Sequence, residues 1–149
     1  MAMKISLLAS ALAFPSLPAC GSDGSEPKRS TFDNTGALCL SPDNGNGNRV
    51  RIQAVVNSCV SGCEVIESVT CSASITGNRI EVSSHLELTR TSGPACTTDC
   101  RHANAECGIV RPAPGAQQLV YGSNEAELSV PLSTSTRLFG VQSDCDFED

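Results

Sequence analysis

The sequence has no tryptophan, one tyrosine and four phenylalanines, so aromatic residues make up 3% of its 149 positions. Proteins stack nucleic-acid bases against aromatic rings, and few rings are present for that purpose. Positive charge is also short, because 10 Lys and Arg stand against 16 Asp and Glu, for a net charge of -6. Nucleic-acid binding needs a basic surface. We therefore expect no nucleic-acid partner.

Several catalytic signatures are missing as well. The sequence contains no G-x-S-x-G nucleophile elbow, no H-E-x-x-H zinc motif, no phosphate-binding P-loop and no G-x-G-x-x-G fingerprint. It also lacks the C-x-x-C dithiol of thioredoxin-type redox enzymes. We expect neither an enzymatic activity nor a cofactor.

No apolar run reaches the roughly 20 residues that a membrane-spanning helix needs. Residues 1–14 instead carry one charge, Lys4, followed by about ten mostly apolar residues, which is typical of a secretory signal. The segment Leu17-Pro18-Ala19-Cys20 follows, and then Gly21-Ser22. We therefore expect an export signal that is followed by a cysteine.

The segment around Cys20 resembles the lipobox of bacterial lipoproteins, an aliphatic residue and two mostly small ones before a cysteine. The resemblance implies a diacylglycerol on the Cys20 sulfur, cleavage before Cys20, and acylation of the new N-terminus, for instance with palmitate. Two or more acyl chains anchor a protein stably. Gly21 stands where an aspartate commonly retains such proteins in the inner membrane, which favours the outer membrane. The alternative is an ordinary signal peptide cleaved near Ala19, with Cys20 left as a free thiol.

The composition divides the chain into three parts. Residues 1–19 are the predicted signal peptide, and 20–37 are a lipidated N-terminus and flexible tether, because this polar stretch has too little apolar surface to offset its ordering entropy. Residues 38–149 form a cysteine-rich β domain with an acidic C-terminal tail.

Apolar and polar residues alternate with period two in four segments of the third part, which predicts strands with one buried face. The predicted buried positions are Val50, Ile52, Ala54 and Val56; Val69, Cys71, Ala73 and Ile75; Ile80, Val82, Leu86 and Leu88; and Ala126, Leu128, Val130 and Leu132. Thr76-Gly77-Asn78-Arg79 is typical of a hairpin. We predict an all-β domain, a small disulfide-stapled antiparallel β-sandwich, with an immunoglobulin-like arrangement as one form that it could take.

One segment departs from the alternation. Between residues 96 and 107, the positions 96, 100, 103 and 107 fall on one helical stripe, so we expect an irregular or short-helical cysteine loop there. Asp99, His102 and Glu106 lie close in this segment and are candidate acid–base or metal-binding groups, although solvated polar residues explain them as well. The segment Asp43–Asn48 superficially resembles a calcium loop, but its spacing fails the EF-hand register.

Without Cys20, eight cysteines remain, an even number that favours disulfides in an exported chain. The candidates are Cys39, Cys59, Cys63, Cys71, Cys96, Cys100, Cys107 and Cys145. Of the many possible connectivities, Cys71 with Cys107 would join two strands and Cys39 with Cys145 would join the domain ends. Zinc held by His85 and His102 together with thiolates is the alternative, but the C-x3-C spacing suits zinc poorly.

The combined pattern resembles small cysteine-rich lipoproteins of myxobacteria. The resemblance rests on Cys20-Gly21-Ser22, Cys39-Leu40, the two cysteine clusters and Leu128-Ser129-Val130-Pro131. It implies a place in the cell envelope, on the periplasmic or surface face, with the membrane and an envelope protein as partners. The function expected is a non-catalytic structural or protein-interaction module. The alternative is an envelope enzyme or metal-binding protein that uses the loop around His102.

Overall fold

The computed structural model describes residues 26–91, 100–140 and 145, and these residues form an all-β domain. The strands are β1 Lys28–Asp33, β2 Ala37–Asp43, β3 Asn46–Val60, β4 Glu64–Thr76, β5 Arg79–Arg90, β6 Arg101–Val110, β7 Gly115–Tyr121, β8 Asn124–Val130 and β9 Thr136–Leu138. The described residues contain no helix.

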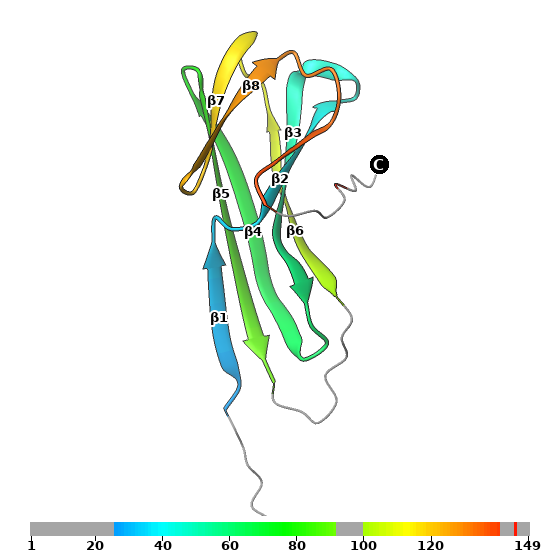
Figure 1. The fold of residues 1–149 in the computed structure, drawn as a ribbon, viewed down its shortest axis with the longest axis vertical. Coiled ribbons are helices and arrows are strands. Elements are labelled where there is room, and N and C mark those ends of the chain that lie inside the picture. The colour runs from blue at the N-terminus through cyan, green and yellow to red at the C-terminus, as the bar shows by residue number, and fades with distance from the viewer. Residues whose placement is uncertain (1–25, 92–99, 141–144, 146–149) are drawn as a thin grey trace, which may run out of the picture.

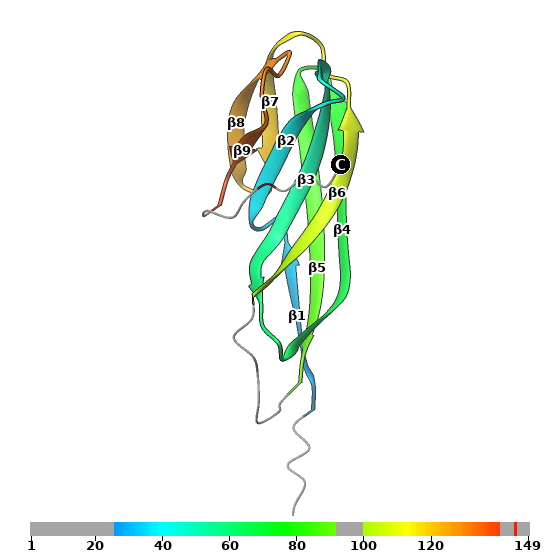
Figure 2. The same ribbon diagram turned by 90° about the vertical axis from the view of Figure 1, so that its right-hand side faces the viewer.

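The strands form two sheets that pack face to face along an elongated molecule (Figures 1 and 2). Sheet A has the order β1-β5-β7-β8, with β4 paired to β5, and sheet B has the order β6-β3-β2-β9. The β-sandwich predicted from the alternation is therefore present.

The edge of β5 opposite β4 is divided between two strands. β4 pairs with β5 along its whole length, so β1 and β7 must both lie on the other edge. β1 pairs antiparallel with the second half of β5, from His85 to Arg90, and β7 pairs parallel with the first half, from Arg79 to Val82. The expectation of a wholly antiparallel sandwich is therefore wrong for the β5–β7 pair.

The core lies between the sheets and consists almost entirely of aliphatic side chains from both. The predicted inward positions of β3 and β5 are all buried, at 5% exposure or less. Those of β4 are half-buried against the same core. Tyr121 of β7 is the one aromatic residue among the fully buried side chains of the described residues.

The hairpin predicted at Thr76-Gly77-Asn78-Arg79 joins β4 to β5, and Gly77 adopts the positive φ of 62° that the turn requires. The segment that resembled a calcium loop is also a hairpin turn. Asn44 and Gly45, between β2 and β3, both have positive φ, as a type I′ turn demands.

The helical interpretation of the second cysteine cluster is wrong from Arg101 onward, because Arg101–Val110 is strand β6 and pairs antiparallel with β3. Ala103, Ala105 and Cys107 are buried in an alternating pattern. A bulge then shifts the alternation by one residue, so that Val110 is the next buried position, and Gly108 takes a φ of 98° there. Residues 96–99 lie outside the described residues.

The tether prediction is wrong for Lys28–Asp33, which form strand β1. These residues are almost all exposed, so the strand is stabilised by its backbone pairing with β5 and not by burial. Composition indicated disorder because it measures only the apolar surface available to each segment.

The chain passes from sheet A to sheet B between β1 and β2 at Gly36. This residue has a φ of 94°, and a Cβ atom built on it would lie 2.0 Å from the Val55 carbonyl oxygen. The crossover therefore requires glycine for two reasons, its backbone conformation and the close approach to β3.

Candidate functional site

The predicted lipid-attachment residue, Cys20, lies outside the described residues. The described chain begins at Glu26, and β1 begins two residues later, at Lys28. In Figure 1 this start lies at the lower end of the sandwich. Since an extended chain spans at most about 3.5 Å per residue, Lys28 lies within about 28 Å of Cys20. A lipid on Cys20 would therefore keep this end of the domain close to a membrane.

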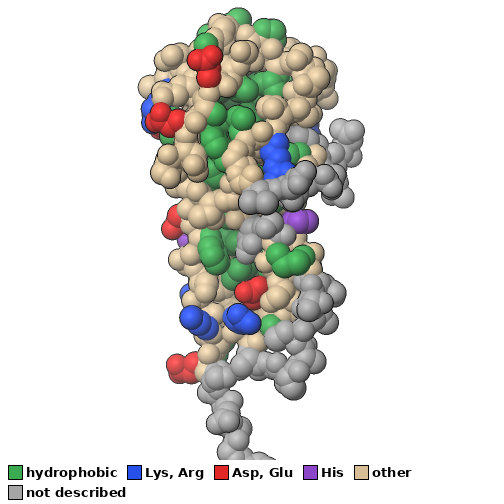
Figure 3. Space-filling view, viewed as in Figure 1, with side chains coloured by type: hydrophobic (Ala, Val, Ile, Leu, Met, Phe, Trp, Pro, Cys, Tyr) green, Lys and Arg blue, Asp and Glu red, His purple; other side chains and the backbone are tan. Residues whose placement is uncertain are grey.

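Basic side chains gather at the same end, and Figure 3 shows several near the bottom of one face. Lys28 and Arg90 are directly opposite each other in the β1–β5 register, and no ion pair within the described part of the chain involves either. Arg29 forms an ion pair with Glu87 at 3.0 Å. Like charges directly opposite each other destabilise the pairing of two strands, so Lys28 and Arg90 do not stabilise the β1–β5 pair.

The predicted acid–base cluster around His102 does not come together. His102 and Glu106 are both exposed on β6, and because a strand rises about 3.3 Å per residue their Cα atoms lie roughly 13 Å apart. On a helix, side chains four residues apart would have been neighbours. Asp99 lies outside the described residues. The described ranges hold no group of three or more His, Cys, Asp or Glu side chains arranged to bind a metal ion.

His85 has a partner that periodicity did not reveal. Its Nδ1 atom lies 2.6 Å from Oδ1 of Asp33, on the neighbouring strand β1. The two residues are opposite each other in the antiparallel register, although 52 positions separate them in the sequence. Both side chains are exposed, at 43% and 67%, so the pair lies on the open outer face of sheet A and not in a cavity. The sequence could have revealed this pair only if Lys28–Asp33 had been predicted as a strand.

Three disulfides are placed within the described residues, and they include both pairings suggested from the sequence. Cys71–Cys107 joins β4 of sheet A to β6 of sheet B, and therefore connects the two layers. Cys39–Cys145 attaches the C-terminal segment to β2, where Cys145 packs against a small second cluster of Ala37, Cys39 and Val55.

The third disulfide, Cys59–Cys100, joins the end of β3 to the residue before β6, with 4.4 Å between the Cα atoms. Cys63 is disulfide-bonded as well. The remaining candidate, Cys96, lies outside the described residues. The thiols that a zinc site would need are therefore consumed at these seven positions.

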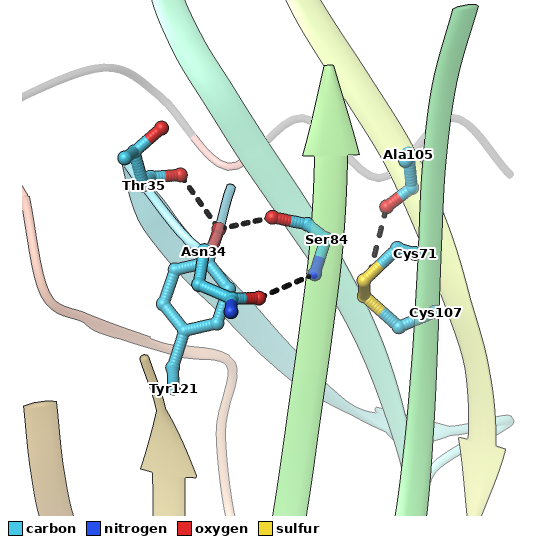
Figure 4. The surroundings of a disulfide bond; sticks show 7 residues. All are labelled: Asn34, Thr35, Cys71, Ser84, Ala105, Cys107 and Tyr121. Carbon is cyan, nitrogen blue, oxygen red and sulfur yellow. Dashed lines mark hydrogen bonds between the residues drawn. A yellow bond between two sulfur atoms is a disulfide. The ribbon is translucent and has the colours of Figure 1, made fainter. Parts of the chain in front are cut away.

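A polar network around the buried Tyr121 and Ser84 side chains lies where the pairing of β5 changes from β7 to β1 (Figure 4). The Tyr121 hydroxyl donates to the Thr35 carbonyl oxygen at 2.6 Å and lies 2.6 Å from Ser84 Oγ. Because its single proton goes to Thr35, we infer that Ser84 is the donor to the tyrosine oxygen. Asn34 completes the junction, since its N–H donates to the Ser84 carbonyl and its Oδ1 accepts from the Ser84 N–H, both at 2.9 Å.

Burial of the ring raises the pKa of Tyr121, and the hydrogen bond from Ser84 opposes this in part. The neutral phenol is therefore the form that this junction holds. Within the network, each of the two buried hydroxyls has a partner, as buried polar groups normally do.

Asp43 is the one carboxylate among the buried polar residues of the described chain, with 2% exposure. Its two oxygens face Arg49 Nη2 at 2.8 Å and Arg51 Nη2 at 3.3 Å, so the residue stabilises the β2–β3 hairpin. The carboxylate is thus used within the protein, which agrees with the sequence argument against a calcium loop at this position.

A shallow groove of about 420 Å³ lies over the β7–β8 hairpin and is lined mainly by polar side chains, including Gln118, Glu125 and Glu127. Gln118 and Glu125 are hydrogen-bonded to each other at 3.0 Å.

Within the ranges that the structure describes, no helix is long and apolar enough to cross a membrane.

A scan of the chain against protein-family models finds no match, and searches of the curated proteins and of the solved structures find none either.

Proposed function

We propose that this chain is a lipid-anchored cell-envelope protein, attached to the membrane through Cys20, whose β-sandwich is a non-catalytic structural or protein-interaction module. The observation that carries the proposal is the Leu17-Pro18-Ala19-Cys20 segment at the end of a short apolar run. Gly21 after the cysteine favours the outer membrane, on either its periplasmic or its surface face.

The position of β1 supports this proposal. β1 begins eight residues after Cys20, at one end of an elongated sandwich (Figure 1). An anchor at that end leaves the long outer faces of both sheets clear of the membrane. A module that meets other envelope components needs such exposed faces.

The alternative, an enzyme or metal-binding protein that uses the loop around His102, gains no support from the described contacts. Strand geometry separates His102 from Glu106. The His85–Asp33 pair has the hydrogen bond that orients a histidine base, but it lies on an open face, where nothing would exclude water from a reaction.

The anchoring is tested by replacing Cys20 with alanine and comparing the variant with Ser22→Ala, which changes the same segment but keeps the cysteine. Cells are fed an alkyne-tagged fatty acid and then fractionated. We expect the wild type and Ser22→Ala to be labelled and to remain with the membranes, and Cys20→Ala to lose both properties. Label and membrane retention in Cys20→Ala would contradict the proposal.

A further inference from the structure

The disulfides differ in their exposure to solvent. Cys39, Cys63 and Cys107 are buried, at 0%, 6% and 8% exposure. By contrast, Cys59 and Cys100 are both exposed, so Cys59–Cys100 is the one bridge of the three placed in the structure that has two exposed ends. A thiolate that attacks a disulfide must reach a sulfur atom, and the rate therefore depends on access.

The backbone around this bridge is also less regular than elsewhere in sheet B. The β3–β6 register shifts between Val55 and Asn57 and again between Asn57 and Val60, and the last pair is Val60 with Arg101. Cys59–Cys100 therefore fastens an end of the sheet at which the ladder of hydrogen bonds is interrupted. Such segments open locally more easily than a continuous ladder.

The other two placed bridges hold parts of the fold that do not depend on this end. Cys71–Cys107 lies within the main core, and Cys39–Cys145 fixes the C-terminal segment to β2. Opening of Cys59–Cys100 alone would leave both sheets connected through Cys71–Cys107. The sandwich would stay folded while two thiols became available at one end.

We propose that Cys59–Cys100 is a thiol-exchange site, which an exported dithiol reductant or a small thiol can open while the core disulfides stay closed. In the first step, a reductant thiolate attacks one sulfur and forms a mixed disulfide, and the other cysteine leaves as a thiolate and takes up a proton. In the second step, the other thiol of a dithiol reductant, or a second molecule of a small thiol, attacks the mixed disulfide. The reductant is oxidised to a disulfide, and Cys59 and Cys100 are both reduced to thiols, with two electrons transferred.

The location of the site suits a partner in the envelope. β3 ends and β6 begins at the same end of the sandwich at which β1 begins (Figures 1 and 2). Arg101, next to Cys100, is exposed and places a guanidinium group at this end, where its Nη2 donates to the Glu64 carbonyl oxygen at 2.9 Å.

The test uses the full mature protein, oxidised, and dithiothreitol as the probe. Samples are taken during reduction under native conditions, free thiols are blocked with one isotopic form of an alkylating reagent, and the remaining disulfides are reduced in denaturant and blocked with the other form. Mass spectrometry then gives the rate at which each cysteine opens. We expect Cys59 and Cys100 to open together, at least tenfold faster than Cys71 and Cys107.

The Cys59→Ser/Cys100→Ser double variant is the control, and we expect it to lose the fast phase and keep the slow ones. Should that variant fail to fold, the rates of the wild-type protein still decide the matter. The proposal is overturned if Cys71–Cys107 or Cys39–Cys145 opens as fast as Cys59–Cys100, or if Cys59 and Cys100 open only when the whole domain unfolds.

Discussion

Tyr121 shows how single residues connect segments that are far apart in this chain. The sequence has one tyrosine, and its ring lies in the core while its hydroxyl reaches the crossover between β1 and β2. Ring and hydroxyl thus serve different purposes: the ring fills an otherwise aliphatic core, and the hydroxyl satisfies Thr35 and Ser84. Tyrosine combines these properties because one end of its side chain is apolar and the other polar.

Replacing Tyr121 with phenylalanine keeps the ring but removes the hydrogen bond to the Thr35 carbonyl and leaves the buried Ser84 hydroxyl without its partner. Since buried polar groups that lose a partner cost about 1–3 kcal/mol, we expect the free energy of unfolding in urea to fall by that amount. Ser83→Ala, one position along β5 on the exposed face, is the matched control and should change stability little. Equal stability of Tyr121→Phe and wild type would show that the network contributes nothing.

Ionisation of the same residue should change the free energy of unfolding at high pH. Burial raises the pKa of Tyr121 in the folded protein above the ordinary value of about 10. Above that pH the unfolded chain releases the phenol proton more readily than the folded protein does. We therefore expect the free energy of unfolding to fall as the pH rises above about 10. Below that pH this group should leave the free energy of unfolding unchanged. Because Tyr121 is the sole tyrosine, tyrosinate absorbance reports it directly.

The phenol should ionise at a higher pH in the folded protein than in denaturant. The alkaline decline in unfolding free energy should be shallower in Tyr121→Phe. A tyrosine that titrates alike in the folded and denatured protein would refute this argument.

At the scale of strands and turns, the crossover at Gly36 is tightly constrained. Gly36→Ala would combine a positive φ with a methyl group pressed against the Val55 carbonyl. Gly45→Ala is the matched control, because Gly45 also has a positive φ, of 74°, but open space around it.

We expect Gly45→Ala to cost about 1 kcal/mol, and Gly36→Ala several times as much or to prevent folding. The measurement is the midpoint of thermal unfolding of the two purified variants, together with the yield of folded protein. Similar midpoints for both variants would mean that the crossover is more adaptable than the structure indicates.

The strands that could be predicted from the sequence are those that bury one face. β3, β5 and β8 alternate clearly because their inward residues form the core, and the hairpin at Gly77 is marked by its own turn residues. β1 could not be predicted, since its pairing with β5 buries almost none of its side chains. For β6, the bulge at Gly108 breaks the period, and the spacing of positions 96, 100, 103 and 107 mimicked a helical stripe.

Some of the site residues could likewise be predicted from the sequence, and others could not. The two suggested disulfide pairings are present because they join ends and strands that a sandwich brings together. The Asp33–His85 pair and the Tyr121 network depend on which strands share an edge of β5, and a single sequence does not record that order. The immunoglobulin-like arrangement stays a prediction.

The whole molecule is an elongated sandwich whose chain enters at one end, close after the predicted anchor. The described strand β1 shortens the segment between Cys20 and the domain compared with the tether of 20–37 expected from composition. If Cys20 carries the proposed lipid, a connection of this length would keep the start of β1 near the membrane. The elongated sandwich has two long outer faces, and the proposed anchor would place one of its ends near lipid.

We propose that Cys20 is the lipidated first residue of the mature protein. The most direct test is the intact mass of the protein extracted from membranes with detergent, followed by fragmentation of its N-terminus. We predict a chain that begins at Cys20 and carries a diacylglycerol group on sulfur and an acyl group on the amine. A chain that begins elsewhere, or one that begins at Cys20 without lipid, would contradict the account.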